Sequence, residues 1–212
     1  MALRVHTRQG EDRRAELLAH AERLFLERGV PETRMADIAD AAGVAKGLTY
    51  WYFDGKESIL LAIALDVRER LRHTQISATA RVPTPLERLY VGTAVSVRFI
   101  DEHWNLYSMI NWALADPTYA ESMGRTSRVH ADDSISLITA GQAHGSIRTD
   151  EDAVLLAHSH QGIVNHMVLS HQRGLIDELD TAAHAAARAV VHLSAATPEL
   201  ANQVIAAHGA AS

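Results

Sequence analysis

Residues 38–53 read Ile-Ala-Asp-Ala-Ala-Gly-Val-Ala-Lys-Gly-Leu-Thr-Tyr-Trp-Tyr-Phe, a pattern that predicts two short helices crossing at a tight turn. Ala39 is small enough to lie where the two helices touch. Gly43 follows four residues later and can adopt the positive φ that such a turn requires, and Val44 can fill the space between the helices. This spacing is typical of a helix-turn-helix, whose second helix lies in the major groove of DNA while the first crosses the backbone.

Charge on the expected second helix suits DNA, although the chain as a whole is acidic. The 212 residues carry a formal net charge of −6, which disfavours a broadly basic, non-specific nucleic-acid binder. Between Asp40 and Asp54, however, the only charged side chain is Lys46, so no carboxylate there repels phosphate groups. DNA binding should therefore depend on a few well-placed contacts to phosphates and base edges.

Four consecutive aromatic residues, Tyr50-Trp51-Tyr52-Phe53, end this helix. They cannot all face one core, because consecutive residues of a helix diverge by roughly 100°. We expect Phe53, and Tyr52 in part, to pack inward. Tyr50 and Trp51 would then offer hydrogen-bond donors to phosphates or apolar edges to thymine methyl groups. Core packing is the alternative role for this cluster.

Helical spacing of apolar residues extends along the whole chain, and the sequence lacks the sustained alternation that marks strands. The pattern predicts a first helix over Arg13–Arg28, a second from an N-cap at Thr33 to Ala41, and a third over about 45–53. A long helix should run from Lys56 to about Ala80, followed by helices over about 86–101, 104–114, 118–144, 151–173 and 178–195, and a short one after Pro198. The 35 Ala residues, beside 5 Pro and 12 Gly, agree with an all-α protein.

The N-terminal residues resemble those of the TetR-type (tetracycline-repressor-like) transcriptional regulators. The resemblance rests on Leu24-Phe25, Gly29, Thr33, Ile38-Ala39, Ala42-Gly43-Val44, Lys46-Gly47, Tyr50, Tyr52-Phe53, Lys56-Glu57 and Leu60. It implies a three-helix DNA-binding domain over residues 1–55, joined by a long helix to a larger helical dimerisation and ligand-binding domain over residues 56–212. It also implies a homodimeric repressor that binds a pseudo-palindromic operator on double-stranded DNA and is released by a small-molecule effector.

The resemblance assigns roles to individual residues of the motif. The residues that it places against DNA are Arg34, Lys46, Gly47, Leu48, Tyr50, Trp51, Tyr52 and Lys56. The sequence departs from the family pattern at Ala45, where Ser or Thr usually caps the helix, and at Thr49, where an aliphatic residue usually packs. A buried Thr49 could pack its methyl group and donate its hydroxyl to the preceding turn.

Aromatic residues also gather in the larger part of the chain. Six of the 11 aromatics lie between residues 90 and 119, and the chain has none after Tyr119. Such a concentration can line an apolar cavity with a few polar groups, although ordinary core packing is the alternative. The candidate ligand-binding residues are Phe99, His103, Trp104, Tyr107, Trp112, Met123 and Asn165, and the effector is expected to be largely apolar.

The later helices suggest a dimer interface. Apolar residues of the segment from Asp152 to Leu175 cover more than one stripe, as in a helix packed on two sides. With the Ala-rich helix over 178–195, this segment could form half of an intersubunit four-helix bundle. A core within one chain is the alternative.

Other classes of protein are disfavoured. The chain has no Cys, and its His residues at 158, 160, 166 and 171 lack the spacing of metal ligands, so neither a metal nor a cofactor is expected. No apolar run approaches the length of a membrane span, and we expect a cytoplasmic protein. The sequence contains none of the common catalytic motifs, which argues against an enzyme. A helical adaptor that binds only other proteins remains the alternative to a DNA-binding regulator.

Overall fold

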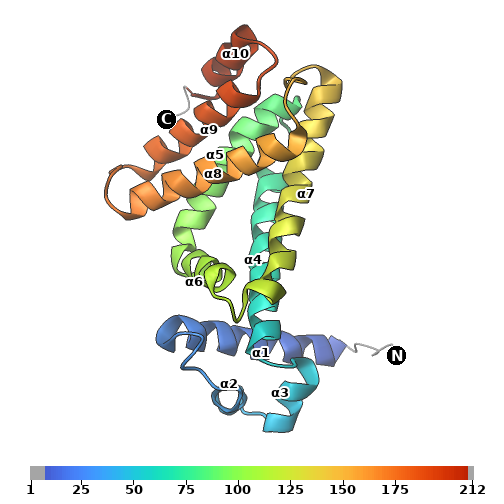
Figure 1. Cartoon of the computed structure of the whole chain (residues 1–212), viewed down its shortest axis with the longest axis vertical. Coiled ribbons are helices and arrows are strands. Elements are labelled where there is room, and N and C mark those ends of the chain that lie inside the picture. Colours follow the sequence, from blue (N-terminus) through green and yellow to red (C-terminus); the bar gives the residue numbers. More distant parts are fainter. Residues whose placement is uncertain (1–7, 210–212) are drawn as a thin grey trace. The chain divides into compact units, whose positions relative to one another are not determined.

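The computed structural model describes residues 8–209, except for the side chains of residues 8, 9, 122 and 124–131. The described chain is all-α and contains ten helices and no strand (Figure 1), as the sequence predicts. The first three are α1 (Arg8–Arg28), α2 (Met35–Ala41) and α3 (Lys46–Tyr52). They are followed by α4 (Lys56–Thr79), α5 (Pro85–Glu102), α6 (Trp104–Ala115), α7 (Ala120–His144), α8 (Ala153–Gln172), α9 (Leu179–Ser194) and α10 (Pro198–Gly209).

Local signals explain where these helices begin and end. Thr84 caps α5, because its hydroxyl accepts a hydrogen bond from the Glu87 N–H while the Glu87 carboxylate accepts one from the Thr84 N–H. Asp152 caps α8 through its side chain alone, because its carboxylate accepts a 2.7 Å hydrogen bond from the Val154 N–H. Gly29, with a φ of 87°, follows the last residue of α1.

Two predictions about the first helices are wrong. The first helix begins at Arg8 rather than Arg13, so it is longer than its apolar pattern indicates. The N-cap of α2 is Arg34 rather than Thr33. Thr33 is buried instead, and its hydroxyl donates to the carbonyl oxygens of Gly29 at 2.8 Å and Leu24 at 3.3 Å. Its side chain therefore closes the turn between α1 and α2.

The chain forms two compact units. The first unit consists of residues up to 67 and residues 105–126, and the second consists of residues 68–104 and those from 127 onward. Helices α4 and α7 contribute residues to both units. The division differs from the boundary between residues 55 and 56 that the family resemblance implies, and that functional boundary stays a prediction.

The core of the first unit joins α1, α2 and the first half of α4. The fully buried side chains that these helices contribute include Leu17, Phe25, Ile38, Ile59, Leu60 and Ile63. Burial of an aliphatic side chain of this size contributes roughly 1.5–3 kcal/mol, so these residues supply much of the free energy that holds the motif together.

The second unit is built around α5, α8 and α9, which pack against one another (Figure 1). Ala182, Ala183, Ala186 and Ala187 of α9 are fully buried within the chain. Their small side chains let α9 approach its neighbours closely, so this face is already occupied within one chain. The turn before α8 is fixed to the end of α9, because the Arg148 N–H donates to the Ser194 carbonyl at 2.8 Å.

Candidate nucleic-acid interface and ligand cavity

Helices α2 and α3 form the helix-turn-helix that residues 38–53 predict. Ala39 is 1% exposed where the two helices meet, and Gly43 in the turn has a φ of 63°. The Val44 N–H donates to the Ala39 carbonyl at 3.0 Å, which closes the turn. A side chain at position 43 would meet no neighbour, so the positive φ alone favours Gly here.

Helix α3 has one buried face and one exposed face. Thr49 lies fully buried on the inner face. Tyr50 and Trp51 are each 45% exposed, and Lys46 and Gly47 are exposed beside them. Leu48 and Tyr52, which are half-buried, flank this surface. The exposed face thus presents an ammonium group, a phenol, an indole and, at Gly47, backbone that no side chain covers.

The aromatic residues divide as the helical geometry predicts. Phe53 is buried, and the Arg14 guanidinium of α1 lies 5.0 Å from the centre of its ring, within cation–π range. The rings of Trp51 and Tyr52 contact edge to face, with their centroids 4.6 Å apart. This contact orients the exposed indole before any ligand binds.

Thr49 differs from what its sequence context predicts. Its hydroxyl was expected to donate to the preceding turn, but Oγ1 is buried and has no hydrogen-bond partner among the described residues. Placing a hydroxyl where the family usually has an aliphatic side chain therefore costs stability, on the order of 1–3 kcal/mol for a buried unpaired polar group.

The two remaining DNA-contact candidates flank the motif. Arg34 is exposed at the start of α2, and its backbone N–H donates to the Asp37 carboxylate at 2.9 Å. Lys56 begins α4, and its Nζ donates to the carbonyl oxygens of Val30 at 2.7 Å and Pro31 at 2.9 Å. An ammonium group has three donors, so Lys56 can hold this loop and still reach one phosphate oxygen.

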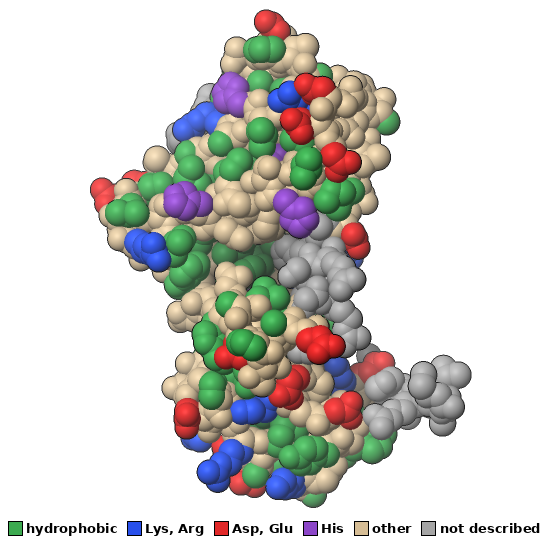
Figure 2. Space-filling view, viewed as in Figure 1, with side chains coloured by type: hydrophobic (Ala, Val, Ile, Leu, Met, Phe, Trp, Pro, Cys, Tyr) green, Lys and Arg blue, Asp and Glu red, His purple; other side chains and the backbone are tan. Residues whose placement is uncertain are grey.

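Charges of both signs surround this surface. On the face drawn in Figure 2, the Lys and Arg side chains of the first unit are interspersed with Asp and Glu, and no continuous basic patch is visible. This face therefore offers no broad basic patch to DNA, which agrees with binding through a few specific contacts from α3.

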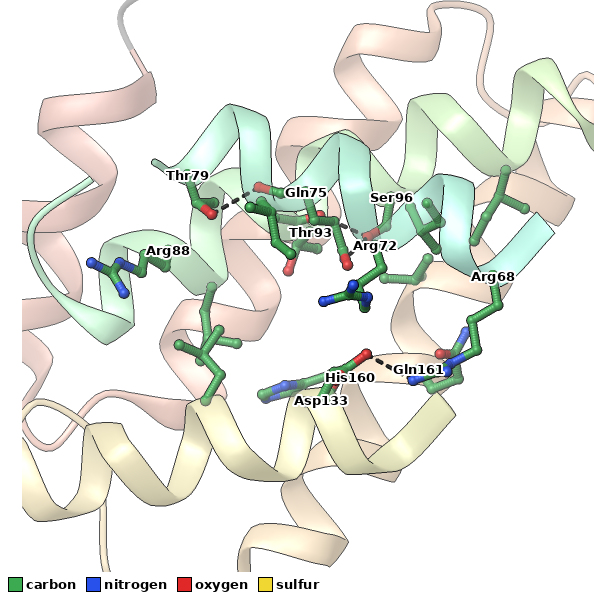
Figure 3. A pocket seen from close by; sticks show the side chains of 18 residues that line it. Arg68, Arg72, Gln75, Thr79, Arg88, Thr93, Ser96, Asp133, His160 and Gln161 are labelled. Atoms are coloured by element: carbon green, nitrogen blue, oxygen red, sulfur yellow. Dashed lines mark hydrogen bonds and ion pairs between the residues drawn. The ribbon is translucent and has the colours of Figure 1, made fainter. Parts of the chain in front are cut away.

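A cavity of about 280 Å³ lies within the second unit, between α4, α5, α7 and α8 (Figure 3). Its apolar lining residues are Leu71, Ile76, Leu89, Ile100, Leu137 and Val164. Gln75 of α4 donates a 2.8 Å hydrogen bond to the Ser96 hydroxyl of α5, which in turn donates to the Gly92 carbonyl at 2.7 Å. These two hydrogen bonds link α4 to α5 in the wall of the cavity.

Ion pairs organise the basic residues on the α4 wall. Arg68 contacts the Asp133 carboxylate of α7 at 2.7 Å. Arg72 forms a two-pronged pair with Glu69 on its own helix, through Nε at 2.9 Å and Nη2 at 2.7 Å. The Arg72 guanidinium thereby lowers the pKa of the Glu69 carboxyl below its ordinary value.

His160 enters the cavity from α8 and is almost fully buried. One of its ring nitrogens, Nε2, lies 2.6 Å from the Ser194 hydroxyl of α9. Burial lowers the pKa of this imidazole to about 4, so the ring is neutral at pH 7.

None of the seven residues that the sequence suggests for ligand binding lines this cavity. Phe99 stacks on His103, with ring centroids 4.2 Å apart, and Asn165 is exposed on α8. In the first unit, Met123 is fully buried and Trp112 is 40% exposed. The remaining two are Trp104, which is half-buried, and Tyr107, which is buried. Their part in ligand binding stays a prediction.

Sequence reasoning missed the cavity residues on α4. Arg68, Arg72 and Gln75 resemble the solvated face of a long connecting helix when the sequence is read alone. The only available signal was an accumulation of Arg residues between 68 and 72 in an acidic chain.

Two further observations concern the described residues alone. No helix among them combines the length and the apolar character that crossing a membrane requires. They also contain no group of three or more His, Asp or Glu side chains that could hold a metal ion.

Comparison with known proteins agrees with the architecture. Residues 17–63 match the family described as bacterial regulatory proteins, tetR family. The HTH-type transcriptional regulator TtgR of Pseudomonas putida is 38% identical over 65 residues, which is 31% of each chain, so the match spans about a third of that relative. The HTH-type transcriptional repressor KstR2 of Mycolicibacterium smegmatis is 29% identical over 153 residues, 70% of this chain and 74% of that protein.

Solved structures extend the likeness beyond the motif. A TetR family transcription regulator from Marinobacter aquaeolei superimposes with a TM-score of 0.70 at 21% identity, covering 89% of this chain and 99% of that one. At this identity the likeness concerns the fold. The chain therefore carries a match to the tetR family over residues 17–63, and as a whole it shares the fold of a solved regulator of that family.

Proposed function

We propose that this protein is a transcriptional repressor that binds a pseudo-palindromic operator as a homodimer and is released by a small molecule. The observation that carries the proposal is the exposed face of α3, where Lys46, Tyr50 and Trp51 offer donors and apolar edges to a major groove. DNA binding is assigned to residues 1–55, and ligand binding and dimerisation to residues 56–212. A regulator bound to DNA acts in the cytoplasm of a bacterium.

Exposed apolar residues on α8 support the dimer. Val154 and Leu155 at its start are 43% and 60% exposed, and Leu175 just beyond its end is 74% exposed. A second copy of α8 that covers this face would bring the chain into the symmetric arrangement that a palindromic operator requires.

Regulation would depend on α4. This helix carries Lys56 at its start and the cavity residues Arg68 and Arg72 further along. A ligand that binds one arrangement of α4 roughly 10²–10⁴ times better than another would shift the population between DNA-binding and released states.

The first experiment is a selection of random DNA duplexes on the purified protein. Wild type should enrich a pseudo-palindrome whose half-sites are about one helical turn apart. Lys46→Ala and Tyr50→Ala should each weaken binding to the enriched site by roughly tenfold or more, while Tyr50→Phe separates the contribution of the hydroxyl from that of the ring.

Arg23→Ala is the matched control for charge, because Arg23 lies exposed on α1 and contacts only Glu27 among the interactions described. It should bind the selected site about as well as wild type. A folded dimer that enriches no sequence at low salt would reject specific DNA binding and favour the protein-binding adaptor.

A further inference from the structure

The cavity of the second unit carries an excess of positive charge. Among its described lining residues there are three guanidinium groups, from Arg68, Arg72 and Arg88, and a single carboxylate, from Asp133. That carboxylate is already engaged, because Arg68 contacts it at 2.7 Å. A cationic ligand would therefore have to break an existing ion pair to find a partner, whereas an anion can accept further hydrogen bonds from the Arg72 guanidinium, which pairs with Glu69 through two of its three nitrogen atoms.

Arg72 is the group best placed to receive an anion. Figure 3 shows its guanidinium extending from α4 into the cavity. Glu69 holds it from one side through Nε and Nη2, which leaves the two N–H bonds of Nη1 for a ligand. Because Glu69 is not among the lining residues, its carboxylate fixes the orientation of Arg72 without occupying the cavity.

The rest of the cavity wall favours an apolar ligand surface rather than a charged one. Leu71, Leu89, Ile100, Leu137 and Val164 supply apolar surface, and His160 is uncharged at pH 7. At about 280 Å³ the space is near the lower end of ligand cavities, which excludes bulky ligands from full enclosure. The ligand should thus combine one anionic group with a compact apolar body.

We propose that the cavity binds a small amphipathic carboxylic acid, with its carboxylate on Arg72 and its apolar part against the aliphatic wall. This inference names the chemical class of the effector and rests on the proposed function for its regulatory meaning. It differs from the largely apolar effector that the aromatic residues suggest, which stays a prediction. A neutral apolar molecule in the same place would displace water from the Arg72 side chain, which is 37% exposed, without offering it an acceptor, and this penalises its binding.

The test uses three probes with the same eight-carbon chain and different head groups: octanoate, octanol and octyltrimethylammonium. Binding to the full-length dimer is measured by titration calorimetry at pH 7, and by the rise in melting temperature that a ligand of the native state produces. Octanoate should bind roughly 10- to 100-fold more tightly than octanol, because it adds hydrogen bonds between charged groups.

Three variants distinguish a direct contact between Arg72 and the ligand from a structural role of the ion pair between Arg72 and Glu69. Arg72→Gln removes the cation and should weaken octanoate binding by roughly 10- to 100-fold, while octanol should bind no more weakly than to wild type. Glu69→Gln keeps the cation but removes its internal partner, so octanoate should bind at least as tightly as to wild type. Arg13→Gln breaks an exposed pair with Glu16 that has the same three-residue spacing, and it should leave all three affinities unchanged.

Each result decides between the alternatives. Tighter binding of octanol or octyltrimethylammonium than of octanoate overturns the proposed ligand class, as does the absence of octanoate binding at millimolar concentration. Equal octanoate affinity in wild type and Arg72→Gln overturns the assigned contact. The duplex selection tests DNA binding without ligand, so its outcome does not depend on these results. The proposed ligand class and the proposed DNA-binding function can therefore be overturned independently of each other.

Discussion

Two buried threonines of the first unit differ in whether their hydroxyl group has a hydrogen-bond partner, and they should therefore have opposite effects on stability. Thr33 and Thr49 are both fully buried. The Thr33 hydroxyl donates to two carbonyl oxygens at the turn after α1, whereas the Thr49 hydroxyl has no partner among the described residues. A buried hydroxyl stabilises a fold only when its hydrogen bond replaces the one lost to water.

Thr49→Val should therefore stabilise the protein by about 1 kcal/mol, because valine keeps the shape and removes the unpaired hydroxyl. Thr33→Val should destabilise it by about 1–2 kcal/mol, because two carbonyl groups lose their donor. Urea unfolding of the two variants and wild type measures both effects. Equal losses in the two variants would mean that Thr49 also has a partner.

His160 predicts a dependence of stability on pH. Its pKa is lowered from 6.5 to about 4 by burial, so between these values the unfolded chain binds a proton that the folded chain does not. The contribution of this residue to stability is complete above pH 6.5 and is lost as the pH falls towards 4. The loss amounts to about 3 kcal/mol when each pKa unit is worth about 1.4 kcal/mol.

The variant His160→Gln should abolish this part of the pH dependence. Other groups titrate in the same range, so the informative quantity is the difference between the unfolding free energies of variant and wild type. That difference should shift in favour of the variant by about 3 kcal/mol between pH 7 and pH 4. A constant difference would show that His160 is protonated as readily in the folded chain as in the unfolded one.

At the scale of helices, the sequence predicts most of the architecture because the signals are local. Helical periodicity, Pro and Gly locate α4 through α10 to within a few residues, and Gly43 identifies the turn of the motif. The cavity is different, since its wall comes from α4, α5, α7 and α8, which are far apart in sequence. Aromatic content alone pointed to Phe99 and His103, which stack on each other outside that wall.

A close approach at the end of α7 gives a prediction for one helix. A Cβ atom at Gly141 would lie 3.2 Å from the Ile147 Cβ and closer still to the rest of that side chain. Ile147 is buried and its backbone pairs with Ala195, so it cannot easily move away. Gly141→Ala should therefore cost about 1–3 kcal/mol, although alanine in a helix normally gains about 1 kcal/mol over glycine.

The control for this prediction is Gly92→Ala in α5, where a Cβ would meet no atom within 4 Å. Thermal or urea unfolding should show a gain of up to about 1 kcal/mol for that variant. Combining Gly141→Ala with Ile147→Val, which shortens the opposing side chain, should recover part of the loss. Additive losses in the double variant would place the cause elsewhere than in this contact.

At the scale of the whole molecule, the central question is what covers the exposed apolar residues of α8. The Ala-rich face of α9 is buried within its own chain, so an interface between two copies has to use other surface. Leu155 is 60% exposed near the start of α8 and belongs to that remaining surface. A twofold interface would contain this residue twice, which doubles the effect of any substitution.

Leu155→Asp tests this arrangement. Two unpaired carboxylates buried in a symmetric interface should raise the dimer dissociation constant on the order of a thousandfold, since each costs about 2 kcal/mol or more. Leu26→Asp is the matched control, because Leu26 is 43% exposed on α1, which belongs to the first unit, and it should leave the dimer intact. Sedimentation velocity measures the oligomeric state, and binding to the selected palindrome measures its consequence. If Leu155→Asp gives a folded monomer that no longer holds the full palindrome, the dimer acts through α8; an unchanged dimer would place the interface on another face of the second unit.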